Sequence, residues 1–238
     1  MMNLKKDKLQ FSKTKLLVSF KEFDEIKKVI DYVDILDLKN PLLGSIGPWC
    51  KKEIVRVIKE FENRKISATL GDINNPDKTF LQLKKFDELG LDFIKFGFLF
   101  KRNSEIDYLL YKIKKRKFKT KIVGVFFAEQ KIIGQYILNN LDKLSNSGVN
   151  YVLIDTYLKG SSDLLDNLSL DLLSNIINKS LLTNVTIGLA GKVKENQIPT
   201  LLKLNPGIIG IRSAACKKND RNGSISINKL KKISKYFA

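Results

Sequence analysis

The chain has 238 residues, of which 43% are hydrophobic, and it carries a formal net charge of +18 and no histidine. This length suits one large domain with a substantial core, and no apolar stretch approaches the roughly 20 residues that span a membrane. The first residues contain no hydrophobic signal segment, so we expect a cytoplasmic protein without a membrane partner. The absence of histidine removes the usual general base and the usual metal ligand, so we expect proton transfer by lysine, carboxylate or tyrosine groups and no metal site.

The positive charge has two interpretations. A basic surface would suit nucleic acid, but lysines are spread through nearly every predicted helix instead of gathering with aromatic residues. Abundant Lys, Asn and Ile with few Arg and Ala is typical of an AT-rich genome, and we favour that explanation over a nucleic-acid partner. The densest run, residues 112–121, is typical of a solvated helix end. Cys50 and Cys216 show no metal-ligand spacing, which predicts reduced thiols.

Short β-branched apolar runs alternate with amphipathic stretches of helical period along the chain. The predicted strands are residues 15–20, 33–39, 65–72, 92–97, 121–129, 151–156, 186–191 and 208–213. The predicted helices that follow them in turn are residues 22–32, 50–63, 77–89, 104–117, 135–147, 171–180, 196–205 and 227–237. Gly and Pro mark the loop after the second strand, and a polar loop follows the sixth.

Eight strand–helix units of similar length predict parallel strands with right-handed crossovers, and favour a closed (β/α)8 barrel, the TIM-barrel fold. An open doubly wound sheet is the alternative, but no strong G-x-G-x-x-G sequence follows the first strand, which weakens a dinucleotide-binding interpretation. We expect residues 1–14 to form a polar tail and residues 15–238 a single catalytic barrel domain.

Charged residues recur at the carboxyl ends of these predicted strands. A strand buried on both faces tolerates ions poorly, so ions at several strand ends indicate a reaction site at one end of the barrel. The group comprises Asp37, Lys39, Asp72, Lys95, Glu129, Asp155 and Arg212. Lys39 and Lys95 stand out because each occupies an otherwise apolar strand. Burial and a second cation both disfavour the ammonium form, and a neutral lysine amine can attack a carbonyl to form an imine.

Two carboxylates are candidates to assist these lysines. Asp37 and Lys39 are two residues apart, so on a regular strand they face the same side, and we expect Asp37 to hold the Lys39 amine. Asp155 and Lys159 flank the end of the sixth strand and form a second carboxylate–amine pair near the mouth.

The ends of the last two strands predict a phosphate site. Small residues there let backbone amides approach an anion, and the ends of strands seven and eight of such barrels often bind phosphate. Arg212 adds a donor suited to two-point contact with a phosphate. The predicted substrate-binding and phosphate-binding residues are Asp72, Gly191, Lys192, Arg212, Ser213 and Ala214.

Six segments, in this order, carry a family resemblance. They are DLKNPLLGSIG, SATLGD, DFIKFG, LIDTYLKG, GLAGK and GIRSAACKKNDRNGSI. Together they resemble the (5-formylfuran-3-yl)methyl phosphate synthase family of methanofuran biosynthesis, over about residues 15–228. The combination of D-x-K-N-P with D-T-x-x-K-G at this separation is fairly specific. Lys192 stands where a small polar residue is more typical of that family, and Ser213 where glycine is usual.

The resemblance implies a (β/α)8-barrel lyase that condenses two molecules of glyceraldehyde 3-phosphate, with loss of phosphate and water. It implies that Lys39 forms the Schiff base and that Lys95 accepts a proton, with Asp37, Asp155 and Lys159 in support. No cofactor is implied, and the partner is a small phosphorylated aldehyde; a homo-oligomer is left open. Two other hypotheses stay open at this point: another phosphosugar aldolase or isomerase on the same barrel, and a basic RNA-binding protein.

Overall fold

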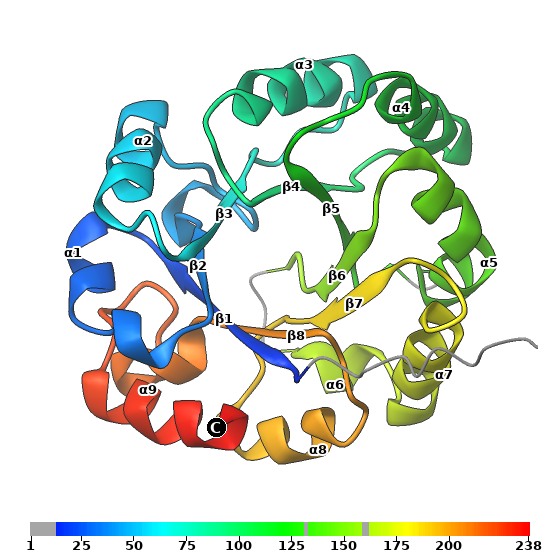
Figure 1. The fold of residues 1–238 in the computed structure, drawn as a ribbon. Helices are drawn as coiled ribbons and strands as arrows, with labels where there is room; N and C mark the ends of the chain where they lie inside the picture. Colours follow the sequence, from blue (N-terminus) through cyan, green and yellow to red (C-terminus); the bar gives the residue numbers. More distant parts are fainter. Residues whose placement is uncertain (1–12, 131–132, 159–161) are drawn as a thin grey trace, which may run out of the picture.

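A closed barrel of eight parallel strands forms the centre of the protein (Figure 1). The computed structural model describes residues 13–130, 133–158 and 162–238. The strands are β1 (Lys15–Phe20), β2 (Ile35–Leu38), β3 (Lys65–Thr69), β4 (Phe93–Gly97), β5 (Lys121–Phe127), β6 (Tyr151–Asp155), β7 (Thr186–Leu189) and β8 (Ile208–Ile211). The first and last strands pair in parallel, with Leu16 beside Ile209, and this pairing closes the ring. The predicted barrel is therefore confirmed and the open sheet is excluded.

Helices form an outer layer around the strands (Figure 1). They are α1 (Phe23–Lys27), α2 (Lys51–Glu60), α3 (Pro76–Asp87), α4 (Asn103–Lys115), α5 (Ile133–Ser147), α6 (Leu164–Asn167), α7 (Leu170–Ser180), α8 (Ile198–Leu202) and α9 (Ile227–Ser234). Short 3-10 turns lie at Ile30–Tyr32, Pro41–Leu43, Glu195–Gln197, Ser213–Ala215, Lys217–Asn219 and Lys235–Phe237. None of the helices in the described part of the chain has both the length and the apolar character required to cross a membrane.

Several predicted elements end earlier in the structure, for local reasons. The helix predicted over residues 22–32 breaks at Val29, whose φ of −139° lies outside the helical range, and it resumes as a 3-10 turn. The helix predicted over residues 196–205 is reduced to α8, because Asn205 adopts a left-handed conformation (φ 54°) and Pro206 follows it. Strands β1 and β4 end where the sequence predicts, whereas the other six stop one to three residues early, so Lys39 and Arg212 each lie one residue beyond a strand.

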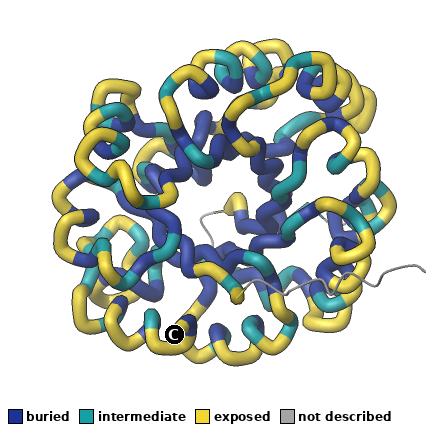
Figure 2. Tube along the Cα trace, in the orientation of Figure 1, coloured by how far each residue is buried: buried dark blue, intermediate teal, exposed yellow. Residues whose placement is uncertain are grey.

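The alternation of side chains along each strand separates two hydrophobic cores. Outward residues such as Val18 and Phe126 pack against the helices in the larger core. Inward residues such as Leu17, Val125 and Leu153 fill the barrel in a smaller one. The strands are accordingly buried, while the outer faces of the helices are exposed (Figure 2).

The inward positions change character along the barrel axis. Near the start of β1 and β2 they are Leu17 and Ile35, whereas two residues further on they are Ser19 and Asp37, which pair in register. On β4, Lys95 follows inward Phe93 in the same way. The apolar half of the interior thus closes one end of the barrel and leaves a polar mouth at the carboxyl ends of the strands.

The predicted N-terminal tail, residues 1–14, falls mostly on residues 1–12, which lie outside the described residues. Thr14 is described, and its hydroxyl donates to the carbonyl oxygen of Pro206 at 2.7 Å. This bond ties the chain to the loop before β8 directly ahead of the first strand.

A cavity in the larger core, between the strands and the helices, should destabilise the protein. Phe126 is fully buried and its ring stacks on Phe98 with centroids 4.2 Å apart. We expect Phe126→Ala to lower the free energy of unfolding by about 3–5 kcal/mol, as measured by urea titration. The exposed aromatic Tyr111 is the control, and Tyr111→Ala is expected to change that free energy by less than about 0.5 kcal/mol. Equal effects of the two substitutions would contradict the described packing.

Candidate active site

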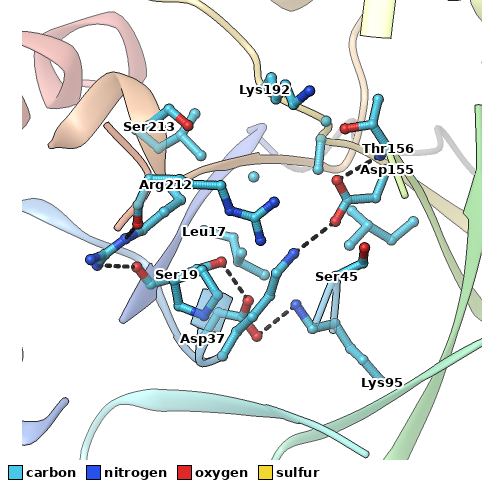
Figure 3. A pocket seen from close by; sticks show the side chains of 18 residues that line it. Leu17, Ser19, Asp37, Ser45, Lys95, Asp155, Thr156, Lys192, Arg212 and Ser213 are labelled. Atoms are coloured by element: carbon cyan, nitrogen blue, oxygen red, sulfur yellow. Dashed lines mark hydrogen bonds and ion pairs between the residues drawn. The ribbon is translucent and has the colours of Figure 1, made fainter. Parts of the chain in front are cut away.

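A pocket opens at the carboxyl ends of the strands (Figure 3). Its polar lining comes from elements that are distant in sequence: Ser19, Asp37, Lys39, Ser45, Lys95, Asp155, Thr156, Lys192, Arg212, Ser213 and Arg221. The closed sheet brings these residues together because the ends of all eight strands form one rim. The structure therefore gathers Asp37, Lys39, Lys95 and Asp155 around one space, as the sequence predicts.

Lys95 and Asp37 form the deepest ion pair of the pocket. The Lys95 Nζ lies 2.6 Å from Asp37 Oδ1, and the two side chains are only 3% and 0% exposed. The second carboxylate oxygen of Asp37 accepts a hydrogen bond from the Ser19 hydroxyl at 2.7 Å. Figure 3 shows Asp37 between Ser19 and Lys95, so both of its oxygens are engaged.

Lys39 forms the second pair, across the pocket with Asp155. Its Nζ donates to Asp155 Oδ2 at 2.9 Å, and the two side chains are 13% and 8% exposed. The other carboxylate oxygen accepts the backbone N–H of Thr156 at 2.8 Å. Lys39 is thus nearer to the pocket opening than Lys95.

The partners differ from the sequence prediction. We expected Asp37 to hold Lys39, because residues two apart on a regular strand face the same side. Lys39 instead lies one residue beyond β2, and its amine reaches Asp155, while Asp37 pairs with Lys95 on β4. Each lysine is held by a carboxylate from a different strand.

Burial and neighbouring charges set the protonation of these groups. Burial lowers the pKa of Lys95, and the charge of Lys39 lowers it further, against the opposing effect of Asp37. For Asp155, burial alone would raise the pKa, but the charge and hydrogen bond of Lys39, the Thr156 N–H and the charge of Lys95 together leave that pKa lowered. The pocket therefore combines a lysine whose ammonium form is disfavoured with a carboxylate whose ionised form is favoured.

The ends of β7 and β8 form the wall predicted to bind phosphate. Gly191 adopts a φ of +97°, and a Cβ there would lie 2.9 Å from the backbone nitrogen of Thr156, so only glycine fits this close approach. Lys192 and Ser213 line the pocket beside it. Ala214 is buried next to Ser213 but is outside the set of residues that line the pocket.

Arg212 also lines this wall, but its donors have protein partners. Its Nη1 and Nη2 contact the two carboxylate oxygens of buried Glu25 at 2.6 and 3.0 Å. The remaining N–H groups donate to backbone carbonyls, namely Ser19 at 3.0 Å, Arg221 at 2.9 Å and Gly223 at 2.7 Å. A guanidinium has five N–H donors, and these five bonds use them all. The direct phosphate contact that we predicted for Arg212 is therefore not offered by this arrangement.

Two other predicted rim carboxylates support loops. Asp72 accepts the backbone N–H groups of Ser45 and Ile46, both at 3.1 Å, and does not line the pocket. Glu129 accepts the N–H groups of Tyr157 and Leu158. Lys159, predicted as a supporting residue, lies outside the described residues.

Sequence reasoning missed four polar residues that line the pocket. They are Ser19, Ser45, Thr156 and Arg221. A small polar residue within the apolar run KLLVSF was a local signal for Ser19. Arg221 lies in a polar loop and has no such signal. Within the described parts of the chain, no three Cys, Asp or Glu side chains are placed to hold a metal ion.

A closed barrel of eight parallel strands surrounded by helices is a TIM barrel, and solved structures agree with this fold. The chain is similar to 3-hexulose-6-phosphate synthase from Salmonella typhimurium, with a TM-score of 0.67 and 15% identity over 94% of this chain and 98% of that one. At this identity the likeness establishes the fold alone.

Sequence comparison identifies the family. The model of the family described as 4-HFC-P synthase matches residues 16–234. The chain is 32% identical to (5-formylfuran-3-yl)methyl phosphate synthase from Methanococcus maripaludis strain C5, over 92% of this chain and 98% of that protein. It is 30% identical to the enzyme of the same name from Archaeoglobus fulgidus, over 89% and 94%. The chain belongs to the 4-HFC-P synthase family, which confirms the predicted resemblance.

The buried pairs predict a pH-dependent loss of stability on substitution. Asp37→Asn leaves the Lys95 ammonium buried without its counter-ion, so we expect the free energy of unfolding to fall by about 3–5 kcal/mol at neutral pH. Asp37 raises the pKa of Lys95 against the effect of burial, so in Asp37→Asn that pKa falls further and Lys95 loses its proton at a lower pH than in the unmodified protein. The uncompensated charge of the variant is therefore removed as the pH rises, and the loss should shrink.

Urea titrations between pH 7 and 9.5 measure this effect. The matched control is Glu60→Gln, which removes the partner of Lys27 in an ion pair whose side chains are 51% and 48% exposed. That variant should lose at most about 1 kcal/mol. A small loss for Asp37→Asn that does not change with pH would contradict the buried pair.

Proposed function

We propose that the chain condenses two molecules of glyceraldehyde 3-phosphate through a Schiff base to give (5-formylfuran-3-yl)methyl phosphate, an early step of methanofuran biosynthesis. The observation that carries this proposal is the pair of lysines, Lys39 and Lys95, that line one pocket while each contacts its own carboxylate. Membership of the 4-HFC-P synthase family supports the product, as do the names of the relatives.

Lys39 is proposed as the nucleophile. Its side chain is 13% exposed against 3% for Lys95, so its amine is the more accessible to a substrate entering the mouth. The amine nitrogen bonds to the aldehyde carbon, the carbonyl oxygen leaves as water, and an imine results. Asp155, 2.9 Å away, holds the amine in place and stabilises the positive charge of a protonated imine.

Lys95 is proposed as the proton acceptor. Burial lowers its pKa, so a larger fraction of its amine is neutral than for an exposed lysine at the same pH. It takes a proton from the carbon next to the imine, and the C–H electrons form an enamine. That carbon then bonds to the aldehyde carbon of the second substrate molecule. Loss of phosphate and water and closure of the ring follow. Asp37 keeps the Lys95 amine in position throughout.

The wall formed by β7 and β8 is proposed to hold a phosphate. Gly191, Lys192 and Ser213 provide backbone groups and one amine around the pocket edge, with Ala214 buried next to Ser213, and the ends of these two strands are a frequent phosphate site in such barrels. Asp72 contributes indirectly by fixing the loop that carries Ser45. On the family resemblance we propose Lys159 as a further supporting residue.

Trapping of the imine tests the proposal. Incubation with glyceraldehyde 3-phosphate and borohydride should leave a reduced adduct on Lys39, located by peptide mass spectrometry, and Lys39→Arg should abolish that adduct because a guanidinium does not form the imine. Lys101→Arg, at an exposed loop lysine, is the matched control and should label at Lys39 like the unmodified protein.

Product analysis completes the test. Mass spectrometry of the reaction mixture should show the aromatic furan phosphate, whereas another phosphosugar aldolase or isomerase would give a non-aromatic sugar phosphate. Full activity of Lys39→Arg, with labelling at a different lysine, would exclude Lys39 from the mechanism.

A further inference from the structure

We propose that Arg221 binds a phosphate of the substrate and that Arg212 is the positioning residue that holds Arg221 in place. The proposal rests on the proposed function to the extent that it takes the substrate to be a phosphorylated triose. It assigns a binding role to a residue in the loop between the 3-10 turn Lys217–Asn219 and helix α9.

Among the described residues, three other cations of the pocket have carboxylate partners and Arg221 does not. Lys39 pairs with Asp155, Lys95 with Asp37, and Arg212 with Glu25. Arg221 lines the same pocket, and it forms no ion pair with any residue in the described part of the chain. A half-buried cation facing a pocket without a carboxylate partner is suited to an anionic ligand.

The hydrogen bonds of Arg221 leave most of its donors available. The described residues give its guanidinium one hydrogen bond, from Nη2 to the carbonyl oxygen of Gly44 at 3.5 Å, which is at the limit of hydrogen-bonding distance. A guanidinium carries five donors in a planar fork that matches two phosphate oxygens. Arg212, by contrast, has no donor available for a ligand, because its five N–H groups all have close partners.

Arg212 fixes the backbone that carries Arg221. Its Nε donates to the carbonyl of Arg221 and its Nη2 to that of Gly223, while the Glu25 carboxylate pairs with both terminal nitrogens of the guanidinium. Further bonds hold the same turn, since Asn222 N–H donates to Asp220 Oδ1 at 2.9 Å and the Lys21 amine donates to the Asn222 carbonyl at 2.9 Å. The Arg221 side chain therefore extends from a loop that is anchored at several points, which limits the ordering cost of binding.

Binding of glycerol 3-phosphate tests the proposal, because this probe keeps the three-carbon chain and the phosphate and has no carbonyl to form an imine. Calorimetry should show that Arg221→Ala weakens binding about tenfold or more, and Arg221→Gln likewise, since a charged hydrogen bond is lost. Arg221→Lys, which keeps the charge without the fork, should fall between. The matched control Lys217→Ala removes an exposed positive charge four residues away and should bind like the unmodified protein.

Arg212 and Glu25 are tested with the same probe. Glu25→Gln removes the ion pair that holds Arg212. It should therefore weaken binding of glycerol 3-phosphate, by a smaller factor than Arg221→Ala does. Combining Glu25→Gln with Arg221→Ala should add little further loss if Glu25 and Arg212 act through Arg221. Fully additive losses would contradict the positioning role.

The outcomes separate this inference from the proposed function. Equal binding by Arg221→Ala and the unmodified protein would overturn the inference, even where borohydride still labels Lys39. Arg221-dependent binding without labelling of Lys39 would support the phosphate site and contradict the Schiff-base reaction. An equal loss of affinity in Lys217→Ala would show that only the overall charge of the loop matters, and would overturn the role of Arg221.

Discussion

The active site depends on the pairing of four charged groups that the barrel removes from water. Lys95 and Asp37 lie 2.6 Å apart with almost no exposure, and Lys39 and Asp155 form a second pair beside them. An isolated ion in such a place would cost several kcal/mol, so each lysine requires its carboxylate. Ser19 behind Asp37 and the Thr156 N–H behind Asp155 satisfy the remaining carboxylate oxygens. A lysine amine can therefore be kept partly dehydrated without unfolding the mouth of the barrel.

The strand positions of these residues could be predicted from sequence, but their partners could not. A lysine in DFIKFG or an aspartate at the end of YVLID is a strong local signal, because apolar strands rarely carry ions. The partners depend on the stagger of the whole barrel. Lys95 is in register with Thr69 and Val123 on its neighbouring strands, yet its amine reaches Asp37 on β2 through the interior. Spacing along one strand, which had suggested Asp37 with Lys39, carries no information about such contacts.

The partners of the two arginines at the rim of the barrel could not be predicted from sequence either. Arg212 follows the last strand directly and has the sequence position of a phosphate ligand, but Glu25 of helix α1 pairs with its guanidinium. Arg221 lies in a polar loop that looks like solvent-exposed chain in the sequence, yet it lines the pocket. A contact between residues 187 positions apart, Glu25 and Arg212, thus decides whether the Arg212 guanidinium can reach a ligand. The local ends of helices, such as the stop at Asn205 before Pro206, follow from nearby residues and are the more predictable part of the fold.

The proposed role of Lys95 as a proton acceptor requires that burial beside Lys39 lowers the pKa of its amine. Nuclear magnetic resonance of the intact protein with ¹⁵N- and ¹³C-labelled lysine, with the Lys95 signal assigned from its loss in Lys95→Arg, reports this titration directly. We expect a midpoint for Lys95 below its ordinary value of 10.5. A midpoint at or above that value would show that the ion pair with Asp37 dominates burial and that Lys95 is no readier to lose its proton than an exposed lysine.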